Sequence, residues 1–162
     1  EIYTLSLHDA LPIWRCDGEE AGLRGCKQWA KDHYDEYVNS GVETAVLCVD
    51  TLADLEYLRV YNKDMTGTVK NNQQFSQLVM DASKDAGHDD IELSSVFFGS
   101  SDAAAFSQAG ITATCLAPMD PRPADYYHNR RDTADRLVPE TIKTGFDVII
   151  STILNFDEKG LN

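Results

Sequence analysis

The stretch Thr44-Ala-Val-Leu-Cys-Val-Asp50 is a short run of apolar and β-branched residues that ends in a carboxylate. A run of this length and composition predicts a strand buried inside a sheet. In residues 22–37, before this run, apolar and aromatic side chains recur at helical spacing, and Asn39-Ser40-Gly41 ends the predicted helix. The stretch therefore predicts a helix followed by a buried strand, which is typical of α/β folds.

The same alternation continues toward the C-terminus. Further strands are predicted over 57–61 and 111–116, and further helices over 71–86, 102–109 and from Pro139 onward. Ser100 or Ser101 is the expected N-cap of the short helix over 102–109. We expect one domain with a three-layer α/β/α sandwich and a mixed, mainly parallel sheet.

Composition restricts the classes of partner. The chain has 162 residues, of which 43% are hydrophobic, and a formal net charge of −13. An excess of negative charge repels nucleic acid and anionic membrane surfaces, and it favours cations. The longest apolar stretch, around 148–154, is too short to span a bilayer. We therefore expect neither nucleic acid nor a membrane as a partner of this segment.

Four cysteines, Cys16, Cys26, Cys48 and Cys115, show neither a C-x-x-C pair nor the spacing of a zinc finger. Because unpaired cysteines are commonly interior, we expect free and mostly buried thiols. A disulfide is the alternative that remains open, since the residues do not decide between a secreted, membrane-anchored or cytoplasmic protein.

The first thirteen residues, from Glu1 to Ile13, match the in-frame translation of a sequencing-adapter oligonucleotide and carry no signal-peptide pattern. We interpret residues 1–13 as non-native, so that natural sequence begins at Trp14. On this interpretation His8 and Asp9 are not metal ligands.

Three segments place acidic or imidazole side chains next to predicted buried elements, where ligands collect in open α/β sheets. They are the glycine-rich turn with Glu19 and Glu20, the strand end at Asp50, and the polar loop 125–133 with His128. Taken singly, each has an ordinary explanation as an exposed acidic turn, a capping carboxylate or a surface histidine. His33 and His88 lie in such ordinary polar surroundings, and we assign them no function.

Together the segments form an ordered set of motifs: Glu-Glu-x-Gly-Leu-x-Gly at 19–25, a strand ending in Asp50, Gly99-Ser-Ser-Asp102, Tyr127-His128 and Asp132-Thr133. This order resembles the zinc-dependent exopeptidases that include bacterial aminopeptidases and glutamate carboxypeptidase, with the transferrin receptor ectodomain and glutaminyl cyclases as relatives. The resemblance runs from about Trp14 to about Leu154. Cys26 departs from the pattern, because the family commonly has a serine there.

The resemblance implies a role for each residue. Glu19 would be the general base that accepts a proton from the attacking water, while Glu20 and His128 would ligate one zinc and Asp50 a second zinc. Asp102 would accept a hydrogen bond near His128 without contacting metal. These roles agree with zinc chemistry, since two metal ions polarise the peptide carbonyl and an unliganded carboxylate takes up the proton.

The family also has a His-x-Asp segment upstream of the Glu-Glu pair, and none lies between Trp14 and Glu19. The resemblance therefore implies that residues 14–162 are the C-terminal part of a zinc peptidase catalytic domain that lacks its N-terminal strands and two of its ligands. We expect the isolated chain to bind zinc weakly and to be inactive. The complete protein would hydrolyse a terminal bond of a peptide substrate, as an aminopeptidase does.

Two alternatives remain open. One is a glutaminyl cyclase-like acyltransferase with a single zinc, and the retention of Asp50 favours two metals over it. The other is a non-catalytic binding domain, against which the joint retention of Glu19, Glu20, Asp50 and His128 argues. The choice between aminopeptidase and carboxypeptidase also stays open, as does the oligomeric state.

The adapter interpretation gives a first prediction. Deleting residues 1–13 should change the free energy of unfolding by no more than about 0.5 kcal/mol, because a segment of non-biological origin has no selected contacts to lose. Thermal or urea unfolding of the full and shortened chains measures the difference. A drop of several degrees in Tm on deletion would contradict the interpretation.

Overall fold

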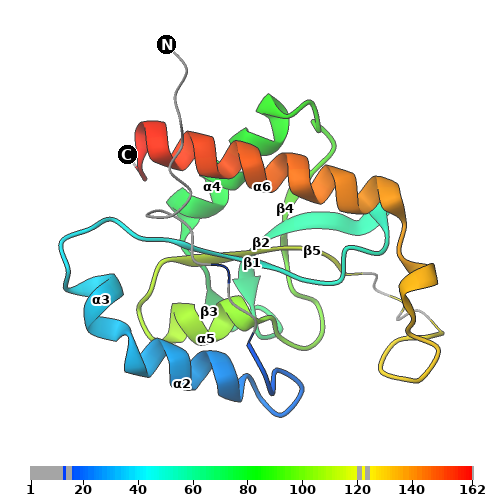
Figure 1. Ribbon diagram of the computed structural model, residues 1–162, viewed down its shortest axis with the longest axis horizontal. Coiled ribbons are helices and arrows are strands. Elements are labelled where there is room, and N and C mark those ends of the chain that lie inside the picture. The colour runs from blue at the N-terminus through cyan, green and yellow to red at the C-terminus, as the bar shows by residue number, and fades with distance from the viewer. Residues whose placement is uncertain (1–12, 14–15, 120–121, 123–124, 162) are drawn as a thin grey trace.

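A central sheet with helices on both faces forms the molecule, as the computed structural model shows for residues 13, 16–119, 122 and 125–161 (Figure 1). The helices are α2 (Arg24–Asp32), α3 (Tyr34–Val38), α4 (Gln73–Asp85), α5 (Asp102–Gln108) and α6 (Pro139–Lys159), with 3-10 turns η1 (Leu55–Tyr57) and η2 (Ala134–Arg136). The strands are β1 (Val46–Val49), β2 (Leu58–Asp64), β3 (Val69–Lys70), β4 (Glu92–Ser95) and β5 (Ala113–Pro118).

Strand β5 connects the two halves of the sheet. It pairs in parallel with β1, where Cys48 lies opposite Cys115, and antiparallel with β2, where Val60 lies opposite Leu116. On its other edge β2 pairs in parallel with β4. Beyond its pairing with β5, on the same edge as β5, the end of β2 pairs antiparallel with β3. The sheet is mixed, as expected, and the described strands pair antiparallel as often as in parallel.

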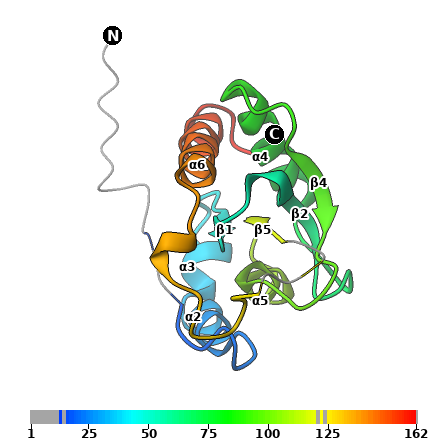
Figure 2. The same cartoon turned by 90° about the vertical axis from the view of Figure 1, so that its right-hand side faces the viewer.

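The three-layer arrangement follows from alternation along β5. Ala113, Cys115 and Ala117 belong to the core cluster shared with α2 and α5, whereas Leu116 belongs to the cluster shared with α4 and α6. Thr114 points the same way as Leu116, since its hydroxyl oxygen lies 2.8 Å from the hydroxyl of Ser76 on α4. Figures 1 and 2 show the result, with α4 and α6 on one side of the strands and α2 and α5 on the other. This confirms the α/β fold class.

The predicted helix before β1 is in fact two helices. The backbone at His33 departs from helical geometry, with φ −112° and ψ 12°, so α2 ends there and α3 begins. The His33 ring stacks on Trp29 with ring centroids 4.4 Å apart, and its Nδ1 lies 3.0 Å from the Trp29 carbonyl oxygen. The His33 amide also donates to the Trp29 carbonyl at 3.0 Å, so the amide nitrogen and Nδ1 of His33 both close the end of α2 at the position where the break occurs.

Strands β3 and β4 are not predicted from the sequence. Strand β3 has only two residues, and β4 reads Glu92-Leu-Ser-Ser95 with just one large apolar side chain. Neither carries the apolar alternation that identifies a strand, and each forms because β2 offers a free edge for pairing.

The caps behave as their residue types predict. Asn72 caps α4 by accepting a hydrogen bond from the Phe75 amide at 2.8 Å, and Ser101, rather than Ser100, caps α5. Pro139 occupies the first turn of α6.

None of the described helices is long and apolar enough to cross a bilayer. Of residues 1–13 only Ile13 lies within the described residues, and it is 95% exposed.

The packing of β5 gives a second prediction. Leu116→Ala removes a fully buried side chain from the middle strand and should cost about 2–5 kcal/mol of stability, through lost burial and a residual cavity. Leu154→Ala, on the exposed side of α6, is the matched control and should cost no more than about 0.5 kcal/mol. Urea unfolding of both variants tests this, and equal losses would refute the assignment of β5 to the core.

Candidate functional site

The Glu19–Glu20 turn reverses the chain just before α2. The Glu19 carbonyl accepts hydrogen bonds from the amides of Gly22 at 2.9 Å and Leu23 at 2.8 Å, and the Asp17 carbonyl accepts one from Gly25 at 3.0 Å. Gly22 has φ +93°, and a Cβ at Gly25 would collide with the Asp17 carbonyl oxygen. The glycines of the motif are therefore required by the backbone, and the turn holds two carboxylates at the start of α2.

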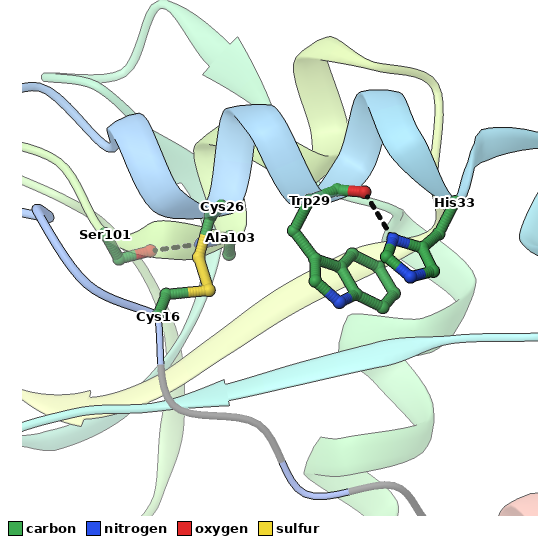
Figure 3. The surroundings of a disulfide bond; sticks show 6 residues. All are labelled: Cys16, Cys26, Trp29, His33, Ser101 and Ala103. Carbon is green, nitrogen blue, oxygen red and sulfur yellow. Dashed lines mark hydrogen bonds between the residues drawn. A yellow bond between two sulfur atoms is a disulfide. The ribbon is translucent and has the colours of Figure 1, made fainter.

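A disulfide joins Cys16 to Cys26 across the base of this turn, with their Cα atoms 5.6 Å apart (Figure 3). The expectation of four free thiols is therefore wrong for this pair. The reason is geometric, because the chain reversal brings residues ten positions apart within the range that a disulfide spans. Cys48 and Cys115 are free, as expected.

The turn meets the loop that carries His128. The Nε2 atom of His128 lies 2.9 Å from a carboxylate oxygen of Glu20, and the imidazole stacks on Tyr127 with centroids 3.8 Å apart. Both side chains are more than half exposed, at 51% for His128 and 69% for Glu20. Two residues that the sequence analysis places on one zinc are thus neighbours in space, on the solvent side of the site.

Asp50 directly follows β1, at the carboxyl end of a strand that runs parallel to β5. Its amide donates a hydrogen bond to the Leu116 carbonyl at 3.3 Å, and its carboxylate accepts one from the Thr51 hydroxyl at 2.9 Å. Thr51 has φ 44°, in the left-handed region. The chain turns sharply here and leaves the Asp50 carboxylate exposed.

The pKa of Glu19 shows that several carboxylates lie close to one another. Its pKa is raised to about 7, first by burial and then by the negative charges of Glu20, Asp102 and Asp50. Its side chain also hydrogen-bonds that of Glu20. Residues from three separate segments therefore act on one carboxyl group, which places the motifs at one site. They line a single open cleft, to which Glu19, Glu20, Asp50, Asp102, Tyr127 and His128 all contribute.

Asp102 occupies the first turn of α5 and is half-buried. Burial, together with the charges of Asp50 and Asp64, raises its pKa to about 6. One of its carboxylate oxygens is buried without a hydrogen-bond partner. Within the described part of the chain no hydrogen bond joins Asp102 to His128, so its role beside the histidine stays a prediction. The charged neighbours that act on its pKa are Asp50 and Asp64.

Asp64 is a structural carboxylate that the sequence analysis missed. It is fully buried, and it accepts hydrogen bonds from the Ser101 amide at 2.9 Å, the Ser101 hydroxyl at 2.5 Å and the Met65 amide at 2.7 Å. It thereby fixes the start of α5 and the position of Asp102. The available signal was a carboxylate ending an apolar strand, as at Asp50, but the predicted strand stopped at Tyr61 instead of Asp64.

The donor set fits a divalent metal such as zinc. Carboxylate oxygens and an imidazole nitrogen are zinc ligands, and mutual repulsion among the carboxylates favours a cation between them. The three expected ligands do not form one compact group, however. Among the described residues, only Cys16, Cys26 and Asp102 bring three potential ligand atoms within 4.8 Å of one another. Asp50 does not join Glu20 and His128 in such a group.

Comparisons with known proteins bear on the family and the fold of the chain. The sequence profile of peptidase family M28 matches residues 6–153. The fold is similar to that of a glutaminyl cyclase from an Acidobacteriales bacterium, with 18% identity and a TM-score of 0.67 over 93% of this chain. It is also similar to the LapA aminopeptidase of Legionella pneumophila (18%, TM-score 0.67, 85% of this chain) and to an aminopeptidase of Aneurinibacillus sp. strain AM-1 (21%, TM-score 0.64, 85%).

The chain spans only part of these structures, namely 50% of the cyclase, 37% of LapA and 31% of the Aneurinibacillus enzyme. Among curated proteins no significant match was found.

The raised pKa of Glu19 gives a third prediction. A carboxyl whose folded-state pKa of about 7 exceeds its usual 4.5 favours the folded state below pH 4.5, and this contribution is lost as pH rises to about 7. Glu19→Gln removes the titration, so in metal-free protein the variant should gain Tm over the parent between pH 4.5 and pH 7. Thermal melts across this range measure the gain, with the exposed Glu92→Gln as control. A difference in Tm that is independent of pH would contradict the shifted pKa.

Proposed function

Because the chain belongs to peptidase family M28, we propose that it contributes part of a zinc-dependent active site that hydrolyses a terminal peptide bond, as in an aminopeptidase. The observation that carries the proposal is the convergence of the Glu20–His128 pair on Glu19, whose pKa is near neutral. Because the chain spans half or less of the similar structures, the activity is proposed for the complete protein.

Glu20 and His128 would hold one zinc, since their donor atoms already lie 2.9 Å apart and a cation between them would replace this contact. Asp50 would hold the second, at the carboxyl end of β1. When bound, zinc supplies Lewis-acid polarisation of the scissile carbonyl. Asp64 would maintain the geometry from within the protein, since it fixes the start of α5 beside this site.

Glu19 would act as the general base. A base works best when its pKa lies near the working pH, and the pKa of about 7 meets this condition in the metal-free chain. Its carboxylate would accept a proton from the attacking water and pass that proton to the leaving amine. For this it must remain unliganded, which its burial behind Glu20 favours, since Glu20 is the more exposed of the two.

The cleft also offers an apolar surface to a substrate. Phe97 and Phe98 are 77% and 80% exposed, and both line the same cleft as Glu19 and His128. Exposed aromatic side chains beside a polar site favour a ligand with an apolar part. We therefore include an apolar terminal side chain in the proposed peptide substrate.

A second candidate is a glutaminyl cyclase-like acyltransferase that uses one zinc at Glu20 and His128. The position of Asp50 outside the compact Glu20–His128 pair favours it, and the fold is shared with a cyclase. Zinc stoichiometry and product analysis separate the two, because hydrolysis releases an amino acid whereas cyclisation releases ammonia from an N-terminal glutamine.

The fourth prediction separates the two glutamates in a chain that carries the upstream ligand segment. Glu20→Ala should lower zinc content and activity together, because a ligand is lost. Glu19→Gln should retain zinc and KM while kcat falls by about 10²–10⁴-fold, which is the usual contribution of a positioned acid–base group. Metal analysis and steady-state kinetics on an aminoacyl p-nitroanilide measure both variants.

Glu92→Gln, an exposed glutamate on β4, is the control and should match the parent. If Glu19→Gln lost zinc as Glu20→Ala does, or retained near-normal kcat, the assignment of Glu19 as the base would have to be abandoned.

A further inference from the structure

The Cys16–Cys26 disulfide encloses the two acidic residues on which the proposed function rests. The bond joins the residue before Asp17 to the first turn of α2, so that residues 17–25 form a covalently closed loop. In Figure 3, Cys16 lies on the segment that approaches the helix and Cys26 on the helix itself. Glu19 and Glu20 are therefore attached to the helix from both ends of the turn.

The two ends of this loop are anchored unequally. Cys26 is 1% exposed, in a core cluster with Leu23 and Ala30 that persists whether or not the bond exists. Cys16 is only partly buried, and no described strand contains it. The disulfide thus joins a partly buried cysteine at the edge of this core cluster to a fully buried one.

The enclosed backbone depends on that attachment. Gly18 and Leu23 adopt φ values of +71° and 59°, in the left-handed region, which is unfavourable for a leucine. Two backbone hydrogen bonds join the first residues of the turn to the start of α2, from the Arg24 amide to the Gly18 carbonyl at 3.1 Å and from the Gly25 amide to the Asp17 carbonyl at 3.0 Å. When the cross-link opens, these two hydrogen bonds must oppose the separation of that end of the turn from α2 without a covalent constraint.

We propose that the Cys16–Cys26 disulfide is a redox-sensitive clamp on the Glu19–Glu20 turn, so that its reduction by a dithiol releases the turn and weakens metal binding at Glu20. The expected effect on metal binding rests on the proposed function, whereas the release of the turn on reduction does not. Cys16 and Cys26 are positioning residues, and neither is proposed to contact substrate.

The reduction balances as an ordinary thiol–disulfide exchange. A thiolate of the dithiol attacks the sulfur of the less buried Cys16, and the sulfur of Cys26 leaves and takes up a proton. The second thiol of the reductant then attacks the mixed disulfide, which releases Cys16 as a thiol and the reductant as a cyclic disulfide. Two electrons and two protons pass from the dithiol to the protein.

The two free cysteines, Cys48 and Cys115, are poorly suited to exchange with the Cys16–Cys26 disulfide. Burial raises the pKa of the Cys48 thiol and that of the Cys115 thiol, and nearby Asp50, Asp64 and Asp102 raise both further. Thiols of this kind react slowly, because the thiolate is the reactive form. A response to reductant is therefore assigned to the Cys16–Cys26 pair.

The expected change in zinc binding on reduction follows from the entropy of loop closure. A bond that spans about ten residues restricts the open chain enough to change a coupled equilibrium by up to about 100-fold. We expect zinc binding to weaken by at least about tenfold on reduction, since Glu20 must then be ordered at the moment of binding.

The test compares the oxidised chain with the chain reduced by dithiothreitol, after mass spectrometry confirms the state of the bond. Hydrogen exchange should lose protection at the amides of residues 22–25, while β2, β5 and α4 retain it. Zinc affinity is compared between the oxidised chain and Cys16→Ser/Cys26→Ser without dithiothreitol, because the reductant and the two freed thiols beside Asp102 would themselves bind zinc. Followed to millimolar concentrations with a competing chromophoric chelator, it should be lower in the variant. Unchanged protection at 22–25, loss of protection throughout the sheet, or equal zinc binding by the oxidised chain and the variant would each overturn the clamp.

Two variants serve as controls. Cys48→Ala/Cys115→Ala retains only the disulfide pair and should respond to reductant as the parent does. Cys16→Ser/Cys26→Ser should show the open-turn exchange pattern without reductant and no further response to it. If the kinetic test of Glu19 failed while the exchange difference held, the proposed function would fall and the redox-sensitive turn would remain.

Discussion

Electrostatic repulsion among carboxylates is the constraint that the rest of this structure must withstand. Glu19, Glu20, Asp50 and Asp102 come from three separate segments. Burial raises the pKa values of Glu19 and Asp102, and the charges of neighbouring carboxylates raise both further. Like charges that approach in a partly desolvated cleft favour protonation or a bound cation. A fold that holds them together in the absence of metal must supply stability elsewhere, and here the sheet supplies it. Its central strand β5 is buried along its whole length and has a helix-packed core on each face.

Asp64 shows how the scaffold transmits that stability to the site. A fully buried carboxylate is costly unless its oxygens are satisfied, and Asp64 accepts three hydrogen bonds, two of them from Ser101. The same Ser101 caps α5, so a single residue links the end of β2 to the helix that carries Asp102. Asp102, at the start of α5, is therefore positioned by an acidic group that is itself fully buried.

Sequence reasoning predicted the fold, and the structure brings most of the predicted site residues close together. The misses have physical causes. The strand ending at Asp50, the helix after Asn72 and the glycine turn at 19–25 were predictable because their periodicity or backbone demands are local. Strand β4 was not, since its pairing depends on β2 and not on its own polar residues. The Cys16–Cys26 bond was missed because connectivity depends on a chain reversal, which counting cysteines does not reveal.

Backbone strain marks the same region independently of the motifs. Leu23, Thr51 and His128 all adopt positive φ values, between 44° and 59°, and each lies in or beside a segment that contributes an acidic or imidazole group to the cleft. Side chains other than glycine rarely adopt this conformation without compensation. Thr51 donates a hydrogen bond to Asp50, Leu23 is buried in the core, and His128 stacks on Tyr127. At each position the strain is offset by packing or by a hydrogen bond, and local strain held in place in this way fits the proposed metal site.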